Sequence, residues 1–211
     1  MFYNLHTHVS VNRLDVFELI NQYPNQVNSS LPSFSVGIHP WYIVSENLQI
    51  DLDAIESNIQ LQNCLAVGEC GLDKRIETDL KFQKKVFIEQ IKIAEKYNKP
   101  LILHCVAAYQ EAIQIKKDLK VQVPMVIHGF SKNYQLAKSL IDNGFYLSFG
   151  KYLLRNPELS DVFKQIPPER IFLETDMIEE TIDLVYQKAQ SAVDFDINQV
   201  VQNNFKRVFN L

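Results

Sequence analysis

Two histidines, His6 and His8, stand two residues apart near the start of the chain. The apolar residues around them predict a strand over residues 2–8. Side chains two apart on a strand point to the same face, about 7 Å apart along the chain, so both imidazoles can bind one metal ion. Two histidines that merely share a polar surface have the same spacing. The choice between these interpretations depends on the rest of the chain.

Further candidate donors also follow predicted apolar strands. Every other histidine has such a position, as do Glu69 and Asp176. A carboxylate at the end of an apolar strand is costly to bury unless it is paired or bound to a metal. Seven metal-capable side chains have such positions: His6, His8, His39, Glu69, His104, His128 and Asp176. Mixed imidazole and carboxylate donors suit Zn²⁺, Mn²⁺ or Mg²⁺, and six such donors would exceed the usual complement of one catalytic zinc, so two ions fit the count better.

Strands and helices alternate along the chain. Helices are predicted at residues 48–62, 79–98, 107–119 and 133–143, a short one before the last strand, and two between about 180 and 209. Strands are predicted at residues 2–8, 16–21, 34–38, 64–69, 101–104, 125–128, 145–149 and 170–175.

This order predicts an α/β protein with an irregular (β/α)8 TIM-type barrel that lacks the helix after the first strand. The carboxyl ends of barrel strands share one face, where the candidate ligands would converge. A flat doubly wound sheet is the alternative, but no phosphate-binding glycine cluster follows the first strand.

Composition limits the function. With 211 residues and 46% hydrophobic content, we expect a single domain over residues 1–211. The net charge of -4 gives no general attraction for nucleic acid and argues against a passive nucleic-acid binder. Three cysteines without zinc-ribbon spacing suit a reducing compartment. Without an export signal or a long apolar segment, we expect a cytoplasmic protein with no membrane contact, and we favour a monomer.

The motifs around these residues resemble the TatD family of metal-dependent deoxyribonucleases, which are amidohydrolase-like barrels. The resemblance implies one metal on His6, His8, Glu69 and Asp176, and a second on Glu69, His104 and His128, with Glu69 as the bridge. It also implies hydrolysis of phosphodiester bonds in DNA. The matching motifs are Asn4-Leu5-His6-Thr7-His8, Gly37-Ile38-His39-Pro40, Gly68-Glu69-Cys70-Gly71-Leu72-Asp73, His104, His128-Gly129-Phe130 and Glu174-Thr175-Asp176.

Three departures from the family pattern are visible. Asn4 stands where the first motif usually has Asp, which we expect to alter a hydrogen bond behind the histidines. Val106 stands where many relatives have Arg, so one expected phosphate contact is absent. Met177 and Ile178 replace a small residue and a proline.

Two neighbouring divalent ions can activate a water and neutralise both oxygens of the displacement at a phosphodiester. We assign the catalytic roles to Glu69, as the bridging ligand, and to Asp176, which would take the proton of the water. Glu174 is expected to pair with a neighbouring cation instead of binding metal. Trp41 and Tyr42 are expected to pack across the barrel mouth, with stacking on a base as the alternative.

Basic residues in the strand-end loops could supply a local positive rim for a nucleic-acid backbone, although ordinary solvated surface explains them equally well. The rim consists of Arg13, Lys74, Arg75, Lys132, Lys151 and Arg155. The residues assigned to substrate binding are His39, Lys74, Arg75 and Lys132, where His39 either supports a ligand or contacts phosphate.

The leading hypothesis is a two-metal deoxyribonuclease. Related barrels share a metal centre across substrates, so hydrolysis of another ester or amide, such as a D-aminoacyl-tRNA bond, is the first alternative. The second is a metal-binding barrel without catalysis that serves as a scaffold.

Overall fold

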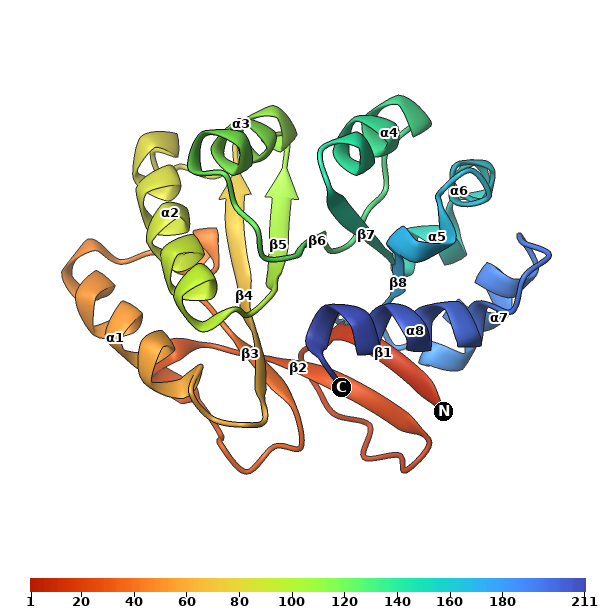
Figure 1. Ribbon diagram of the computed structural model, residues 1–211, viewed down its shortest axis with the longest axis horizontal. Helices are drawn as coiled ribbons and strands as arrows, with labels where there is room; N and C mark the ends of the chain where they lie inside the picture. The colour runs from red at the N-terminus through yellow and green to blue at the C-terminus, as the bar shows by residue number, and fades with distance from the viewer. The chain divides into compact units, whose positions relative to one another are not determined.

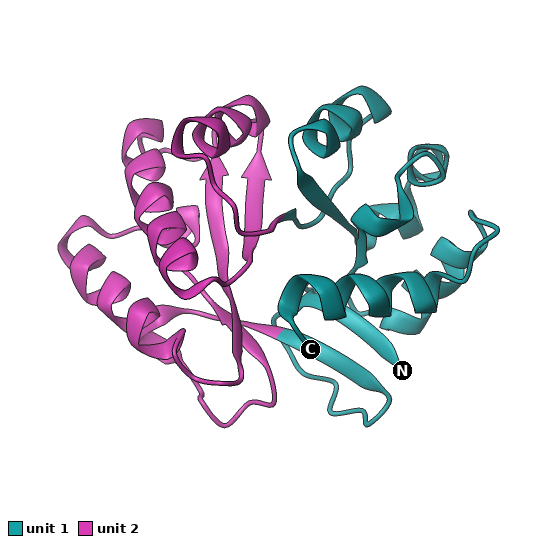
Figure 2. Cartoon of the chain, viewed as in Figure 1, with its two compact units in different colours: residues 1–19, 126–211 teal, residues 20–125 magenta.

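The computed structural model describes residues 1–211 as two compact units. Unit 1 comprises residues 1–19 and 126–211, and unit 2 comprises residues 20–125 (Figure 2). The single domain expected over residues 1–211 stays a prediction. None of the helices combines the length and the apolar character that a membrane span requires.

Eight strands follow one another in the sheet in the order of the sequence (Figure 1). The pairings of β2 with β3, β3 with β4, β4 with β5 and β7 with β8 are parallel. After β8, Asp176 forms a parallel bridge with Thr7 of β1. The predicted (β/α)8 barrel fold and all eight predicted strands are confirmed. The strands are β1 (Phe2–Thr7), β2 (Val16–Gln22), β3 (Phe34–Val36), β4 (Cys64–Asp73), β5 (Leu101–Val106), β6 (Met125–Ile127), β7 (Phe145–Phe149) and β8 (Ile171–Leu173).

No helix lies between β1 and β2, as predicted. The short helix expected before the last strand is two helices, because Asn156 precedes a proline and adopts an extended backbone that interrupts the helix. The Asn156 side chain then accepts a hydrogen bond from Glu158 N and caps the second helix. The helices are α1 (Leu48–Asn58), α2 (Leu80–Tyr97), α3 (Tyr109–Leu119), α4 (Tyr134–Asp142), α5 (Lys151–Arg155), α6 (Pro157–Phe163), α7 (Ile182–Gln190) and α8 (Ile197–Phe209).

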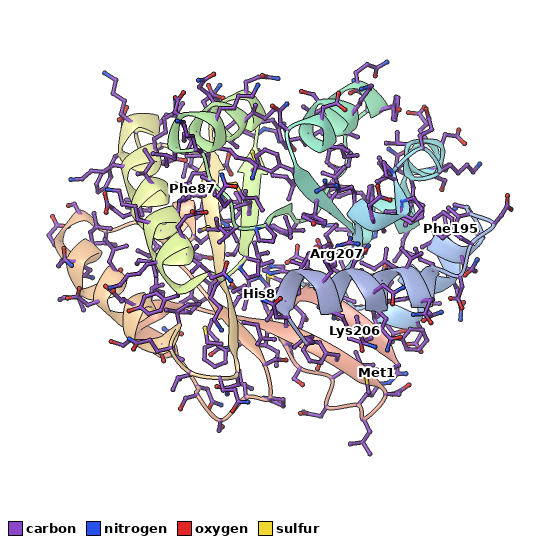
Figure 3. The ribbon with its side chains drawn as sticks, viewed as in Figure 1. Met1, His8, Phe87, Phe195, Lys206 and Arg207 are labelled. Atoms are coloured by element: carbon purple, nitrogen blue, oxygen red, sulfur yellow. The ribbon has the colours of Figure 1, made fainter.

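In unit 2, α2 supports β4 from one side. The helix begins after Asp79, whose carboxylate accepts hydrogen bonds from the first free backbone N–H groups. It ends at Asn98, which adopts the left-handed conformation, two residues before Pro100. Phe87 and its apolar neighbours are buried on the inner face (Figure 3). This packing fixes the strand that carries Glu69.

In unit 1, α8 supports both β1 and β8. Phe205 of α8 packs against Tyr3 and Phe172, with ring centroids 5.0 and 5.2 Å apart. The hydroxyl of Tyr186 in α7 accepts a hydrogen bond from Tyr3 N and donates one to Tyr3 O. These contacts fix the strand from which His6 projects.

Candidate metal centre

In unit 1, His6 and His8 lie beside the carboxylate of Asp176. Asp176 Oδ1 is 3.7 Å from His6 Nε2 and 3.5 Å from His8 Nε2. The donor atoms of all three residues lie within 4.8 Å of one another. His6 is buried, whereas the Asp176 side chain is 37% exposed. This cluster offers two imidazoles and one carboxylate, a donor set that suits Zn²⁺ or Mn²⁺.

The backbone of Asp176 holds its carboxylate at these histidines. Asp176 has a φ of 58°, a left-handed conformation that is uncommon for residues other than glycine. Asp176 N donates to His6 O at 2.9 Å, and His8 N donates to Asp176 O at 3.4 Å. These bonds to β1 offset the cost of the conformation.

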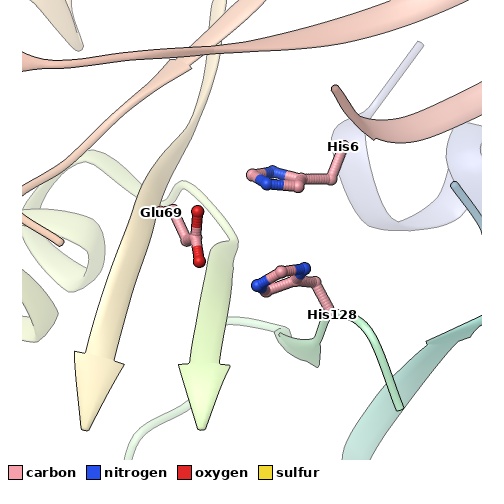
Figure 4. Close-up of side chains that lie close together, drawn as sticks. All are labelled: His6, Glu69 and His128. Carbon is pink, nitrogen blue, oxygen red and sulfur yellow. The ribbon is translucent and has the colours of Figure 1, made fainter. Parts of the chain in front are cut away.

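His128 joins this group from the end of β6. The rings of His6 and His128 are 4.4 Å apart between centroids, and Figure 4 shows both side chains. Buried Glu174 accepts a hydrogen bond from Gly129 N at 2.7 Å, and its Oε1 is 3.3 Å from His128 Nδ1. A carboxylate at Nδ1 keeps the proton there and leaves the Nε2 lone pair for a metal. Glu174 therefore lies beside the imidazole of His128, which it orients, and not beside the cation expected from the sequence.

Asn4 of β1 forms two hydrogen bonds with Thr175, the residue before Asp176. Its Oδ1 accepts a hydrogen bond from Thr175 N at 3.0 Å, and its Nδ2 donates to Thr175 Oγ1 at 2.8 Å. Both groups are buried. The amide thus connects β1 to the segment that carries Asp176.

In unit 2, Glu69 occupies an irregularity of β4. The predicted strand end at this residue is wrong, since β4 continues to Asp73. The pairing of β4 with β5 shifts register between Val67 and Cys70, an irregularity of the strand that includes Glu69. Figure 4 shows the Glu69 side chain on β4. An irregularity in a strand can redirect a side chain and let an internal strand residue serve a site.

Two imidazoles approach the Glu69 carboxylate. Glu69 Oε1 is 3.1 Å from His39 Nε2 and 3.0 Å from His104 Nδ1. The donor atoms of these three residues also lie within 4.8 Å of one another. His104 was expected to end its strand, but β5 continues for two further residues because it pairs with the extended β4.

His39 has a supporting position. It does not end a strand as predicted, since β3 stops at Val36, and it instead caps the 3₁₀ turn Pro40–Tyr42. His39 Nδ1 accepts a hydrogen bond from Trp41 N at 3.1 Å, so the ring proton is on Nε2, which donates to Glu69. In this tautomer His39 orients the carboxylate and has no lone pair directed at the cluster.

Asp73 has a role that the sequence reasoning missed. Its Oδ2 accepts a hydrogen bond from Trp41 Nε1 at 2.8 Å and lies 3.1 Å from His104 Nε2. Its Oδ1 accepts a hydrogen bond from Arg75 N at 2.8 Å. Burial by itself raises the pKa of Asp73, but these hydrogen bonds outweigh burial and lower it. The carboxylate directs His104 Nδ1 toward Glu69. Its place in the Gly68–Asp73 motif was the only available signal.

Carboxylates neutralise half of the expected positive rim. Lys74 Nζ lies 2.6 Å from Glu111 Oε1, and Arg155 donates to Glu180 at 2.8 Å. Arg13 is held between Asp15 and Asp183. Arg75 and Lys132 are exposed.

Trp41 and Tyr42 contact residues at the strand ends but remain partly uncovered, and their expected packing across the barrel mouth stays a prediction. The ring of Trp41 lies 5.2 Å from that of His39 and 5.8 Å from that of His104. The side chains of Trp41 and Tyr42 are 57% and 55% exposed. Trp41 Nε1 donates a hydrogen bond to Asp73. This bond fixes one edge of the indole, and much of the ring remains uncovered.

Comparisons with known proteins agree on one family. The chain matches the family model described as TatD related DNase over residues 2–210. It is 30% identical over 199 residues to YcfH of Escherichia coli K12, named an uncharacterized metal-dependent hydrolase, across 84% of this chain and 74% of YcfH. It is 32% identical over 146 residues to a protein of Vairimorpha ceranae named as a homologue of the deoxyribonuclease TATDN1, across 68% of this chain and 51% of that protein.

Solved structures share the fold. The TatD homologue YjjV of Escherichia coli K12 superposes with a TM-score of 0.84 at 20% identity, covering 100% of this chain and 98% of YjjV. A TatD family hydrolase from Entamoeba histolytica superposes with a TM-score of 0.82 at 17% identity, covering 99% of this chain and 97% of that protein.

Proposed function

Because the chain belongs to the family of TatD-related DNases, a group of metal-dependent hydrolases, we propose that it hydrolyses phosphodiester bonds of DNA with two divalent metal ions. The observation that carries the proposal is that each unit places imidazole and carboxylate donors together: His6, His8 and Asp176 in unit 1, and Glu69 and His104, with His39 beside them, in unit 2. Histidines and acids are costly to bury, and a bound ion is one way to offset that cost.

The donor chemistry fits two divalent ions. His6, His8 and Asp176 would hold one, with Glu69 as a further ligand, and Glu69, His104 and His128 would hold the other. The strands that carry these residues are parallel strands of a (β/α)8 barrel, in which the carboxyl ends share one face. When bound, two such ions supply an acidified water and neutralise the developing charge on the phosphodiester.

The protein side chains have distinct tasks in this proposal. Asp176 takes the proton of the attacking water, because it is the more exposed of the two catalytic carboxylates. As the P–O bond to the leaving group breaks, the leaving oxygen takes up a proton from solvent, and Asp176 returns its own proton to solvent. Glu69 stays in place because His39 donates to it. Asp73 and Glu174 hold the proton of one imidazole each, so that His104 and His128 present a defined nitrogen.

Cations of the strand-end loops would hold the DNA backbone. Arg75 and Lys132 are exposed and suited to contact phosphate. Lys74 would have to exchange Glu111 for a phosphate. His39, which donates to Glu69, would act on the phosphate only through that carboxylate.

The test is a cleavage assay on single- and double-stranded DNA with Mg²⁺, Mn²⁺ or Zn²⁺, with a chelator control. Activity should require metal and fall to background in His6→Ala and Glu69→Ala. Metal content per chain should decrease from about two ions to one or none in Glu69→Ala. Cleavage that persists unchanged in both variants contradicts the proposal.

One observation favours a second candidate, the hydrolysis of an uncharged ester or amide. Arg13, Lys74 and Arg155 are neutralised by carboxylates, which weakens a phosphate-binding rim. A panel of aryl esters, amides and aminoacyl esters under the same metal conditions separates the two. Turnover of such a substrate without DNA cleavage selects the second candidate.

A further inference from the structure

An aromatic pocket of about 490 Å³ lies entirely within unit 2, next to His39. Its volume is in the range of small-molecule sites in proteins. One wall is the segment 23–26 and the other is the segment 37–44, with Asp51 of α1 completing the lining. Because His39 donates to Glu69, the pocket begins one side chain away from a candidate metal ligand.

Four aromatic rings line this pocket, those of Tyr23, His39, Trp41 and Tyr42. Tyr23 and Tyr42 meet edge to face, with ring centroids 5.2 Å apart and an interplanar angle of 88°. Tyr42 also lies 5.5 Å from the ring of His39. Tyr42 and Trp41 remain more than half exposed, although large aromatic side chains are usually covered in a folded protein. Exposed rings beside a cavity are suited to stacking on a planar ligand.

The wall is held in place before any ligand arrives. Trp41 is fixed by two hydrogen bonds: its Nε1 donates to Asp73, and its backbone N–H donates to His39 Nδ1. The side chain of Gln90 accepts a hydrogen bond from Ile38 N at 2.7 Å and donates one to Ile38 O at 3.1 Å. A fixed indole loses little conformational entropy when a ring stacks on it.

The polar lining excludes phosphate and fits the edge of a heterocycle. No lysine or arginine lines the pocket, and Asp51 is its only acid. Asn25 and Gln26 supply amide groups that both donate and accept hydrogen bonds. An uncharged planar ring with donors and acceptors along its edge matches this surface, whereas a phosphate would meet a carboxylate and no cation.

We propose that this pocket binds a nucleobase of the substrate, stacked at Trp41 and Tyr42 with its edge at Asn25 and Gln26. This inference rests on the proposed nucleic-acid substrate and names the part of the substrate that the pocket recognises. Phosphate contacts are left to cations outside the pocket. The binding step is independent of metal, because no candidate metal ligand has to contact the base.

Trp41 is the only tryptophan of the chain, so intrinsic fluorescence excited at the indole reports on this pocket alone. The full-length protein is titrated in excess chelator with a short oligothymidylate and with an abasic strand of the same length. The thymine strand should quench the fluorescence, and the abasic strand should bind at least about tenfold more weakly. Tyr42→Ala should weaken binding of the thymine strand by about tenfold.

Tyr152→Ala is the matched control, because it makes the same change at an exposed tyrosine of unit 1 outside the pocket, and it should leave the titration unchanged. Equal affinity for the abasic and thymine strands overturns the inference, as does a Tyr42→Ala protein that binds like the unchanged one. Circular dichroism of each variant checks that it is folded. Quenching without DNA cleavage would support base binding in the pocket and reject the proposed DNA hydrolysis. Cleavage without quenching would support DNA hydrolysis and reject base binding in the pocket.

Discussion

Substitution of Asp73 tests whether this buried carboxylate fixes the proton of His104. In Asp73→Asn, an amide oxygen at the place of Oδ2 still accepts from Trp41 Nε1 and His104 Nε2. The amide NH₂ then faces Arg75 N, which loses its hydrogen bond to the side chain at position 73. Because Arg75 is exposed, water can accept a hydrogen bond from this N–H instead. His104 therefore keeps its proton on Nε2, and Nδ1 remains available for a metal. In Asp73→Ala no acceptor is left, and the proton is free to move to Nδ1.

The expected magnitudes follow from the hydrogen bonds that each variant keeps. In other proteins, removing the group that hydrogen-bonds a metal-binding histidine lowers metal affinity by roughly 10- to 100-fold. Asp73→Asn loses only the charge of the acceptor and should bind metal about tenfold more weakly. Asp73→Ala loses the acceptor itself and should bind about a hundredfold more weakly. The free energy of unfolding should decrease by about 1 kcal/mol for Asn and by about 2–3 kcal/mol for Ala.

Two measurements separate binding from folding. Competition between the protein and a chelating indicator gives the affinity for Zn²⁺ or Mn²⁺, and urea unfolding of the metal-free protein gives its stability. Asp142→Asn is the matched control, because it makes the same change at a carboxylate that is 55% exposed on α4. Asp142→Asn should leave the metal affinity unchanged, and it should change the free energy of unfolding by no more than an exposed ion pair usually contributes.

Two outcomes would refute the reasoning about Asp73. One is unchanged metal affinity in both variants, which means that the carboxylate does not control the imidazole. The other is an equal loss in Asn and Ala, which means that charge alone matters and the position of the proton does not.

Three further predictions concern other contacts. Arg75→Gln should weaken DNA binding and reduce the dependence of log Kd on log salt by about one, as measured by fluorescence anisotropy at several salt concentrations, whereas Lys138→Gln on α4 should leave both unchanged. Asn4→Asp should leave stability nearly unchanged, because a threonine hydroxyl can reverse its hydrogen bond, whereas Asn4→Ala should lower the free energy of urea unfolding by about 1–3 kcal/mol. The hydrogen bonds from Arg13 lower the pKa of Asp183 below its ordinary value of 3.8, so their stabilising effect is present above that pH and is lost as the pH falls through the lowered value. Arg13→Gln should therefore destabilise the protein at neutral pH, and urea unfolding should show this difference disappearing below about pH 3.8.

The sequence by itself determined the order of the strands and helices. Alternating apolar segments and helical periodicity are local patterns, and they located all eight strands, including the direct connection from β1 to β2. The motifs also indicated which side chains could bind metal, since imidazoles and carboxylates after apolar strands are few in this chain. A local pattern is sufficient for these results because each element forms over a few neighbouring residues.

Strand ends near the candidate site were less accurate. Glu69 was placed at the end of β4, but it lies within the strand, at an irregularity in the pairing with β5. His39 was placed at the end of β3, but it lies three residues after that strand and caps the turn that begins at Pro40. Register and capping depend on the neighbouring strand and on side-chain geometry, which hydrophobic periodicity does not encode.

Only the tertiary structure decided the partners of the candidate donors. Glu174 lies 46 positions after His128, and Asp183 lies 170 positions after Arg13, yet each pair is in contact. Hydrogen bonds of this kind fix the proton of an imidazole or cancel the charge of a guanidinium, so they decide whether a residue of suitable type can act. Such pairs form when distant segments pack together, and the sequence near either residue contains no record of the other.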